Sequence, residues 1–303
     1  MAQKKIKNQK PELMIGGQAV MEGVLMRSND SYAIAVRKPN GKILVKKEKY
    51  VSITKKNKIL GLPFIRGIIM LGETIGLGYK AMTFSANQIV KEESKKISSK
   101  KQELGTAELV ITLGISIIFG IALFKFLPLL IATLLKNQLA GSNLLFNIID
   151  GVAKFLILVL YLVLISLMKD VKRLFQYHGA EHKAVHCYEH NKKLTVENVK
   201  TDSKAHARCG TTFILIVLFL SIIFYLFIPF STNFWLKLLI RIAFLPVITG
   251  IAYEWIKLAG KHTDNWLAKI LIAPGLLVQG LTTREPDDKQ IEVAIKALKA
   301  VVG

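Results

Sequence analysis

The sequence has few cysteines, few acidic residues and no cleavable signal peptide. Its N-terminal stretch MAQKKIKNQKPELM is polar and rich in lysine, whereas a signal peptide needs an apolar core. Acidic residues number 21 against 42 lysines and arginines, so the formal net charge is +21. A chain this basic attracts anionic lipid headgroups or nucleic acid. No nucleic-acid motif and no basic stretch interleaved with aromatic residues is present, so we expect membrane lipids, and not nucleic acid, as partners.

Apolar residues are abundant and gather in four long blocks. They make up 51% of the 303 residues, and the mean hydropathy of +0.39 is high for a soluble protein. A membrane span needs about 20 mostly apolar residues, and its backbone must be satisfied internally, which requires a helix. We therefore predict an α-helical integral membrane protein with about four transmembrane helices, plus interfacial helices and a small cytoplasmic β-rich N-terminal element. The blocks are 109–135, 144–168, 211–230 and 235–259, the last interrupted by Lys237, Arg241 and Pro246.

Positive charge is distributed unevenly around these blocks, and its distribution predicts their orientation. Lysines are dense before the first block and between the second and third, whereas the loop between the first two carries only Lys136. By the positive-inside rule, the N-terminus, the 169–210 loop and the C-terminus are cytoplasmic, which agrees with an even number of spans. Because the cytosol is reducing, we expect no structural disulfide between Cys187 and Cys209.

Outside the apolar blocks, a β-hairpin signal lies near the N-terminus. Residues 13–55 alternate apolar and polar side chains on both sides of the Pro-Asn-Gly sequence at 39–41, which is typical of a turn between strands. The C-terminal part predicts a second interfacial helix, a turn around Arg284 and a final amphipathic helix. The expected segments are a cytoplasmic N-terminal β-hairpin element (1–58), an interfacial amphipathic helix and linker (59–105), transmembrane helices 1 and 2 (106–168), a cytoplasmic loop (169–210), transmembrane helices 3 and 4 (211–260) and a cytoplasmic C-terminal amphipathic segment (261–303).

Residues 59–90 are apolar but contain two charges on one helical face. Arg66 and Glu73 are seven residues apart, which is close to two helical turns. The pattern predicts an amphipathic helix on or partly in the membrane surface, with a fifth span as the alternative. We expect Arg66 to form a structural ion pair with Glu73 or with Glu22. Residues 91–103 are rich in lysine, glutamate and serine and predict a solvated linker.

Four histidines follow one another at intervals of four in QYHGAEHKAVHCYEH (176–190). On a helix, residues i and i+4 lie on one face, so His178 and His182 can place two ring nitrogens on one metal ion. The two histidines belong to an HxxEH pattern, in which Glu181 is positioned to take a proton from water at the metal. The pattern has only three fixed positions, so further ligands are needed to make it informative.

The far end of the same loop supplies such ligands. His206 and Cys209 lie just before the third apolar block. Because the second and third spans are expected to be neighbours, these two residues return to the membrane surface near His178 and His182. Imidazole and thiolate ligands suit zinc. We therefore predict that these four side chains bind a divalent metal ion, zinc.

The sequence also predicts roles or positions for other residues near the motif. His186 is either a further ligand or a support for the ligands. Glu22, with glycines near it on both sides, is a candidate for an additional carboxylate at the site. Glu189 is expected at the surface and His190 in solvent. The alternatives to a metal site are a histidine stripe that faces solvent or lipid, and a satisfied polar core.

Six stretches occur in an order that points to a known family. They are GGQAVMEGVLMR (16–27), PFIRG (63–67), FQYHGAEHKAVHCYE (175–189), LTVENV (194–199), HARCGTTF (206–213) and LTTREPD (281–287). Over nearly its whole length the chain resembles the YqhQ-type bacterial membrane proteins, a family of unknown function suggested to be metal-dependent enzymes. The resemblance implies a multi-pass protein of the bacterial cytoplasmic membrane. The family pattern, which has proline in place of Ala207, points to His178, Glu181, His182, His186, His206 and Cys209.

Two functional hypotheses follow. In the first, the protein is a metal-dependent membrane hydrolase with Glu181 as general base, acting on an ester, amide or phosphoester presented by a lipid or a membrane protein. In the second, it is a non-enzymatic membrane-protein biogenesis or assembly factor that binds a partner protein or the translocation machinery. Binding of both His206 and Cys209 would then fill the coordination of a structural metal. A transporter fits poorly, because no charged or broken-helix pair marks a site at mid-membrane.

Overall fold

The computed structural model describes residues 15–97, 106–261 and 266–303, which form a mostly helical molecule with one small sheet. The strands are β1 (Gly16–Val20), β2 (Gly23–Arg27), β3 (Ser31–Arg37) and β4 (Ile43–Lys49). The helices are α1 (Ile53–Lys56), α2 (Ile65–Ile97), α3 (Thr106–Ile121), the π-helical η1 (Ala122–Phe126), α4 (Leu127–Leu134), the 3₁₀ turn η2 (Lys136–Gln138), α5 (Asn143–Ser166), α6 (Lys169–Glu189), α7 (Val196–Lys200), α8 (Gly210–Tyr225), α9 (Phe234–Ala243), α10 (Leu245–Lys261), α11 (Trp266–Thr282) and α12 (Asp288–Val302).

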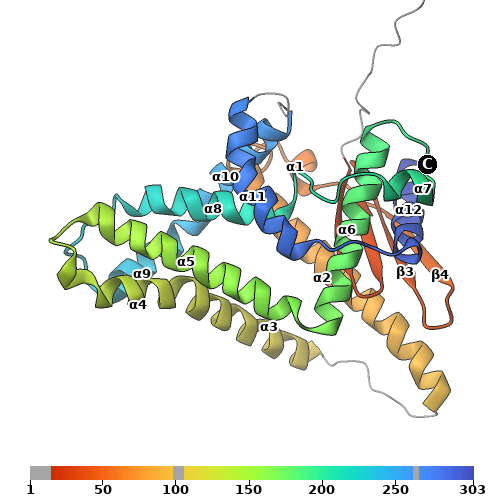
Figure 1. Cartoon of the computed structure of the whole chain (residues 1–303), viewed down its shortest axis with the longest axis horizontal. Coiled ribbons are helices and arrows are strands. Elements are labelled where there is room, and N and C mark those ends of the chain that lie inside the picture. Colours follow the sequence, from red (N-terminus) through yellow and green to blue (C-terminus); the bar gives the residue numbers. More distant parts are fainter. Residues whose placement is uncertain (1–14, 98–105, 262–265) are drawn as a thin grey trace, which may run out of the picture.

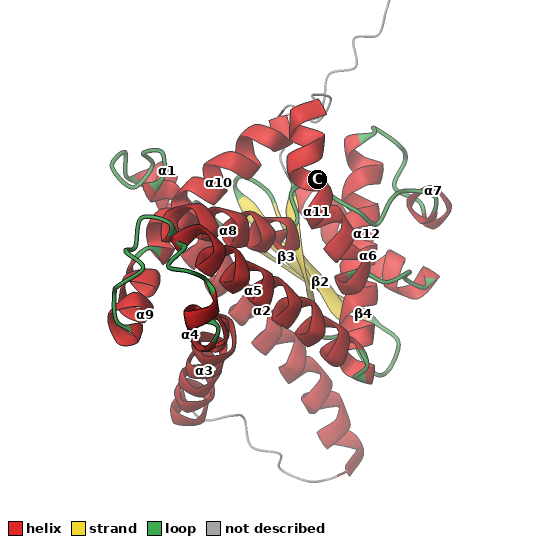
Figure 2. Cartoon of the chain, turned by 60° about the vertical axis from the view of Figure 1, so that its left-hand side comes forward, coloured by secondary structure: helices red, strands yellow, loops and turns green. Residues whose placement is uncertain are grey.

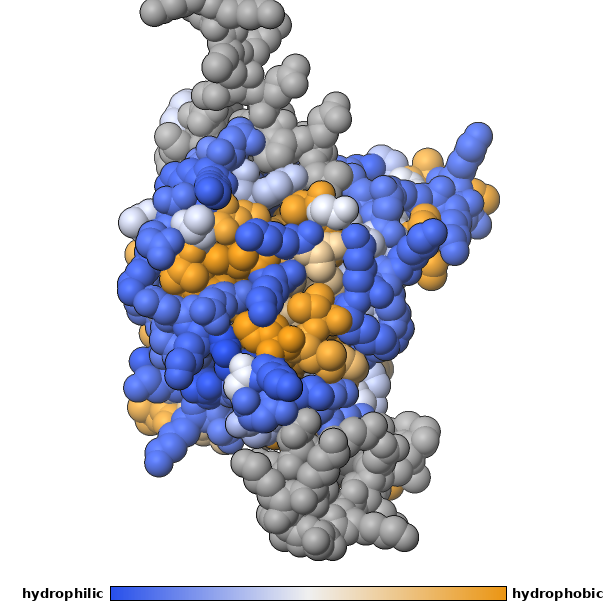
Figure 3. Space-filling view, turned by 90° about the vertical axis from the view of Figure 1, so that its right-hand side faces the viewer, coloured by the Kyte–Doolittle hydropathy of each residue, from blue (hydrophilic) through white to orange (hydrophobic). Residues whose placement is uncertain are grey.

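The molecule has an apolar end and a polar end. Helices α3, α4, α5, α8 and α9 extend to the left of Figure 1, and the sheet lies on the right with α6, α7 and α12. The face at the sheet end is largely hydrophilic, with small apolar areas between the polar side chains (Figure 3). The N-terminal strands, the 169–210 loop and the C-terminal helix are therefore close together at one end of the molecule.

The sheet is an antiparallel meander in the order β1-β2-β3-β4. In the hairpin expected around residues 39–41, β3 and β4 pair from Arg37 with Ile43 to Ser31 with Lys49, and Gly41 has a φ of 82°. This confirms the hairpin. A second hairpin precedes it, because Val20 pairs with Gly23 across a two-residue turn that contains Glu22.

Helices cover both faces of the sheet. Val24 and Met26 of β2 pack on Ala180 of α6 and on α12, whereas Leu25 points the other way and packs on Leu77 of α2. This is the alternation of side chains along a strand. The strands are seen between α2 and the α6–α12 pair in Figure 2. Each such apolar side chain contributes about 1.5–3 kcal/mol when fully buried, so segments distant in sequence form one folded unit.

Helix α2 differs in three respects from the amphipathic helix expected at 59–90. It begins at Ile65 and continues to Ile97, so residues 91–97 are helical and not linker; residues 98–105 lie outside the described part. One side of it is buried on the sheet. The predicted ion pair of Arg66 is wrong: Arg66 pairs with Glu254 of α10, and Glu73 pairs with Arg27 of β2.

Two helices in the described residues are long and apolar enough to cross a membrane. They are Gly114–Leu134, which joins α3, η1 and α4, and α5, with lengths of 21 and 24 residues. A third candidate exists if α9 and α10, which bend by 41° at their junction, count as one span. Pro246 in the first turn of α10 lacks the backbone N–H that a continuous helix would use, which accounts for the break.

The third predicted span is shorter than expected. Helix α8 has 16 residues, which corresponds to about 24 Å at the rise of an α-helix. A hydrocarbon core is about 30 Å thick. The helix ends at Tyr225, and turns around Pro229 lead to α9. Length and composition therefore support two or three candidate spans among the described residues, against about four expected.

A buried group of charges links α5 to α9. Arg241 donates from Nη1 to Asp150 Oδ1 at 2.6 Å and from Nη2 to Asn147 Oδ1 at 3.1 Å. Lys154 is also ion-paired with Asp150. Asp150 and Arg241 have relative exposures of 0% and 1%. This group and the bend between α9 and α10 lie within the apolar part of the molecule.

Candidate metal centre

Helix α6 presents the HxxEH motif at its middle. The helix is held in place by the sheet on one side and by the α11–α12 linker on the other. Gly179 is essential to the second contact, because a Cβ at this position would lie 2.1 Å from the carbonyl oxygen of Arg284. The backbone N–H of Arg284 also donates to the carbonyl of Phe175 at 2.9 Å. The linker therefore runs directly against the turn of α6 that carries the motif.

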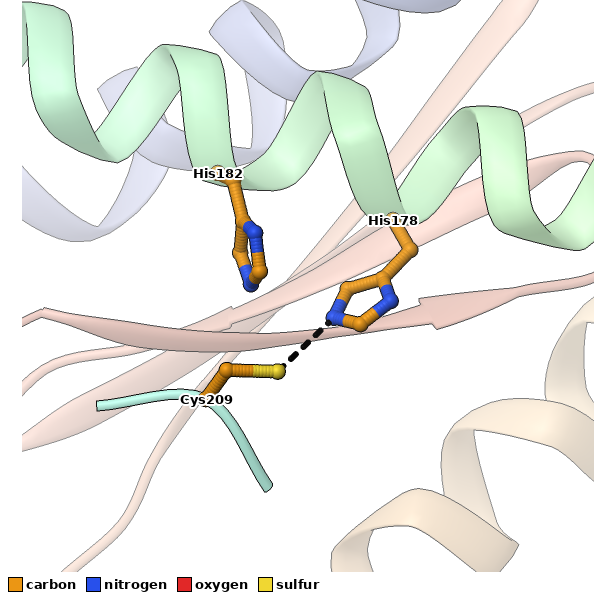
Figure 4. A group of neighbouring side chains, drawn as sticks. All are labelled: His178, His182 and Cys209. Carbon is orange, nitrogen blue, oxygen red and sulfur yellow. Dashed lines mark hydrogen bonds between the residues drawn. The ribbon is translucent and has the colours of Figure 1, made fainter. Parts of the chain in front are cut away.

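His178 and His182 meet Cys209, which lies at the N-cap of α8 (Figure 4). One ligand atom from each of the three side chains lies within 4.8 Å of the others. The Cys209 Sγ is 3.4 Å from the Nε2 of His178. His182 and Cys209 are buried, and His178 is half-buried. The structure thus brings together three of the four predicted metal ligands from two elements that are distant in sequence.

The other ring nitrogen of each histidine is held by a backbone carbonyl. His178 Nδ1 lies 2.8 Å from the Thr282 carbonyl oxygen, and His182 Nδ1 lies 2.6 Å from that of Lys204. A carbonyl only accepts, so each Nδ1 carries the proton and donates it. The Nε2 atoms are therefore unprotonated, and their lone pairs point to the side of the rings where a metal ion could bind. This is the usual arrangement around metal-binding histidines, in which the second nitrogen donates to a neighbouring oxygen.

Glu181 lies beside this group. Its Oε2 is 3.5 Å from the Nε2 of His182, and the side chain is buried. Burial raises the pKa of the Glu181 carboxyl and lowers the pKa of His182. A Cβ on Gly17 of β1 would lie 2.6 Å from Glu181 Oε1, so only glycine leaves room for the carboxylate there. Gly17 therefore serves the site, which the spacing of the sequence did not reveal.

His206, the fourth predicted ligand, lies outside the three-residue group. Its Nε2 is 3.3 Å from Glu189 Oε2, and its Nδ1 accepts from the backbone N–H of Arg208. Gln279 fixes its backbone by donating to its carbonyl and accepting from its N–H, at 2.8 and 2.9 Å. His206 therefore supports the loop that carries Cys209.

Glu189 is part of this support and is half-buried, although the sequence suggested a surface position. It is ion-paired with Arg208. Burial alone would raise the pKa of the Glu189 carboxyl, but the hydrogen bond from His206 and the charge of Arg208 outweigh it and lower the pKa to about 2. The carboxylate is therefore ionised at neutral pH and ties the end of α6 to the chain before α8.

The two residues expected to assist the ligands lie in different places. His186 donates from Nε2 to the carbonyl of Ala205 at 2.7 Å, and its ring lies 4.8 Å from that of His206. It thus holds the same loop. Glu22 is ion-paired with Arg173 and accepts from the Tyr177 hydroxyl at 3.2 Å, so it contacts α6 before the motif and does not reach the three-residue group.

The donor set suits a zinc ion. Two neutral imidazoles and a thiolate are among its preferred ligands, and three protein ligands leave one position for water or substrate. The nearby carboxyl of Glu181 supplies either a base or a fourth ligand. The sequence did not predict the role of the Thr282 and Lys204 carbonyls, because backbone groups leave no signal in residue types. The region around Thr282 was marked only by the stretch 281–287, one of the six that carry the family resemblance.

Comparison with known proteins agrees with the resemblance drawn from the six stretches. A family model described as "Protein of unknown function (DUF1385)" matches residues 62–303. The chain is 35% identical over 296 residues to "Uncharacterized protein YqhQ" of Bacillus subtilis (strain 168), which covers 95% of this chain and 92% of that protein. No solved structure matches. The chain therefore belongs to the DUF1385, YqhQ-type family of proteins of unknown function.

Proposed function

We propose that the protein is a zinc-dependent hydrolase at the cytoplasmic face of the bacterial cytoplasmic membrane. The observation that carries the proposal is the convergence of His178, His182 and Cys209 within 4.8 Å, with the Glu181 carboxyl beside them. The Nδ1–H groups of both histidines are held by carbonyls, and a carboxyl lies nearby, as expected of a preorganised metal site. In a histidine stripe that faces solvent, the rings would instead be exposed to water.

The residues divide into ligands and a base. His178, His182 and Cys209 hold the metal, which would supply a Lewis acid that polarises the substrate and lowers the pKa of water. Glu181, buried beside the ligands, accepts a proton from the attacking water. The substrate is an ester, amide or phosphoester carried by a lipid or a membrane protein.

The membrane arrangement supports this location. The chain leaves the polar end of the molecule along α3 and returns with α5, and it leaves again with α8 and returns with α9 and α10. Two such excursions keep the N-terminal strands, α6 and α12 on one side, as an even number of spans requires. The positive-inside rule makes that side cytoplasmic. In this arrangement the chain crosses the membrane four times, and α8 with the turns after it forms the third crossing.

The second candidate is a structural zinc in an assembly factor. The observation in its favour is the burial of Glu181, His182 and Cys209, with exposures of 5%, 3% and 6%. If the Glu181 carboxylate is the fourth ligand, coordination is closed. The metal would then tie α6 to the loop before α8, and the polar end would bind a partner protein or the translocation machinery.

The first experiment is elemental analysis of the purified protein and of four variants. His178→Ala, His182→Ala and Cys209→Ala should each lose a near-stoichiometric metal, whereas His206→Ala should retain most of it. A wild-type protein purified without chelator and free of metal would remove the basis of both proposals.

Glu181→Gln separates the two candidates. A hydrolase should keep the metal and lose turnover, because an amide cannot accept the proton. A structural centre with Glu181 as ligand should lose metal affinity and thermal stability together. Glu181→Asp serves as the matched variant that preserves the charge.

A further inference from the structure

A basic hollow lies beside the candidate metal centre, where α5 ends and α6 begins. Its volume is about 360 Å³. It is formed by the end of α5, the first turns of α6, the loop before α8 and the α11–α12 linker. The residues that line it are Ser166, Lys172, Gln176, Lys204, Gly280, Leu281, Thr283, Arg284 and Glu285.

The charge of the hollow is positive and largely uncompensated. Lys172, Lys204 and Arg284 line it, and within the described residues none of the three takes part in an ion pair. The one lining carboxylate, Glu285, is directed to Lys183, whose Nζ lies 2.6 Å from its Oε1. A hollow with three cations and a neutralised carboxylate favours a multiply charged anion.

The guanidinium of Arg284 has hydrogen-bond donors that are not fully used. Its Nη2 makes one long bond, 3.4 Å to the Ser166 carbonyl oxygen. Its Nε is buried and has no partner among the described residues. An unpaired buried donor is costly, and the planar fork of a guanidinium matches the oxygens of a phosphate. A phosphate group in the hollow would satisfy this donor.

The hollow and the metal centre share their walls. Lys204 lines the hollow, and its carbonyl accepts from His182. Thr282, whose carbonyl accepts from His178, stands between the lining residues Leu281 and Thr283. A group bound in the hollow would thus lie next to the backbone segments that orient the two histidines.

We propose that this hollow binds the phosphate group of a phosphate monoester or of a phospholipid headgroup. Its position at the junction of the apolar α5 and the polar α6 is where a headgroup would reach the protein from the bilayer. Resting on the proposed function, the same inference names the substrate of the hydrolase as a molecule that carries a phosphate group.

The experiment uses the full-length protein in a maltoside detergent that contains no phosphate, titrated with inorganic phosphate by calorimetry. The variants are Lys172→Gln and Arg284→Lys, which keeps the charge but removes the fork. Lys42→Gln, on the exposed β3–β4 turn, is the matched control. Wild type and control should bind phosphate saturably, and each of the two hollow variants should bind about tenfold more weakly, as expected for loss of one charged hydrogen bond.

A second arm distinguishes the two sources of phosphate. Micelles of the same detergent that contain phosphatidic acid should block the titration if a lipid headgroup fills the hollow, and should leave it unchanged if the ligand is a soluble ester. Absence of saturable phosphate binding by the wild type in the lipid-free detergent would overturn the inference, as would equal affinities in all four proteins.

Metal content, measured on the same samples, keeps the two proposals separate. A protein that holds zinc but binds no phosphate contradicts this inference alone. A protein without zinc that binds phosphate, with loss in the Lys172→Gln and Arg284→Lys variants, contradicts the hydrolase and leaves the phosphate site standing.

Discussion

Gly17 of β1 lies directly against Glu181 of α6, so that a Cβ at position 17 would stand 2.6 Å from both the Cγ and the Oε1 of the glutamate. The same Cβ would be 2.8 Å from the Leu25 carbonyl oxygen of the neighbouring strand. The carboxyl of the candidate centre is therefore positioned by a strand near the N-terminus as well as by its own helix.

Replacing Gly17 with alanine should displace the Glu181 side chain. Because both helix and strand are packed on their other sides, we expect a loss of about 1–3 kcal/mol in the free energy of unfolding, together with reduced activity or altered metal affinity. Gly16→Ala is the control, since a Cβ there meets nothing within 4 Å. Equal stability and metal content in the two variants would show that the carboxyl does not depend on this contact.

Gly179→Ala should push the α11–α12 linker away from α6. The added Cβ would meet the Arg284 carbonyl oxygen at 2.1 Å, and the shift should weaken the hydrogen bond between His178 and Thr282. We expect thermal unfolding at lower temperature and weaker zinc binding in a competition with a chromogenic chelator. Gly72→Ala, in an open part of α2, should be neutral or more stable by up to about 1 kcal/mol. A Gly179 variant as stable as the Gly72 variant would contradict the close contact.

Metal retention should persist below the ordinary titration range of histidine. Burial lowers the pKa of His182 from 6.5, so its neutral, ligating form is favoured in the folded protein. Its contribution to stability and metal binding is present above pH 6.5 and is lost as the pH falls through the lowered pKa. Zinc content after dialysis across a pH series measures this. Release at or above pH 6.5 would argue against a buried, neutral His182.

Asp150→Leu should destabilise the apolar helices strongly. It leaves Arg241, which is 1% exposed, without its carboxylate, and removal of one partner from a buried pair costs about 3–5 kcal/mol. Unfolding in detergent, followed by intrinsic fluorescence, measures the loss. The triple variant Asp150→Leu, Lys154→Leu, Arg241→Leu should recover much of it, because neither buried cation that pairs with Asp150 then remains without a carboxylate. Asp30→Asn breaks the exposed pair with Lys55 and should cost no more than about 1 kcal/mol.

Local patterns in the chain were sufficient for several elements. The alternation around residues 39–41 predicts the β3–β4 hairpin, because strand periodicity and turn residues act over short distances. The i, i+4 spacing of His178 and His182 predicts their common helical face for the same reason. The apolar blocks at 109–135 and 144–168 correspond to the two long candidate spans, since length and hydropathy are properties of the segment alone.

Tertiary structure decided the rest. Chain order alone does not reveal that Gly17 makes room for Glu181, that Arg66 pairs with Glu254 and not with Glu73, or that His206 turns to Glu189. Each of these depends on the packing of segments far apart in sequence, which fixes positions to within an ångström and so determines which of several compatible partners a side chain meets. Residue types and their spacing are sufficient to propose a candidate metal centre on one helix, whereas the fold determines which three side chains converge and which carbonyls orient the two histidines.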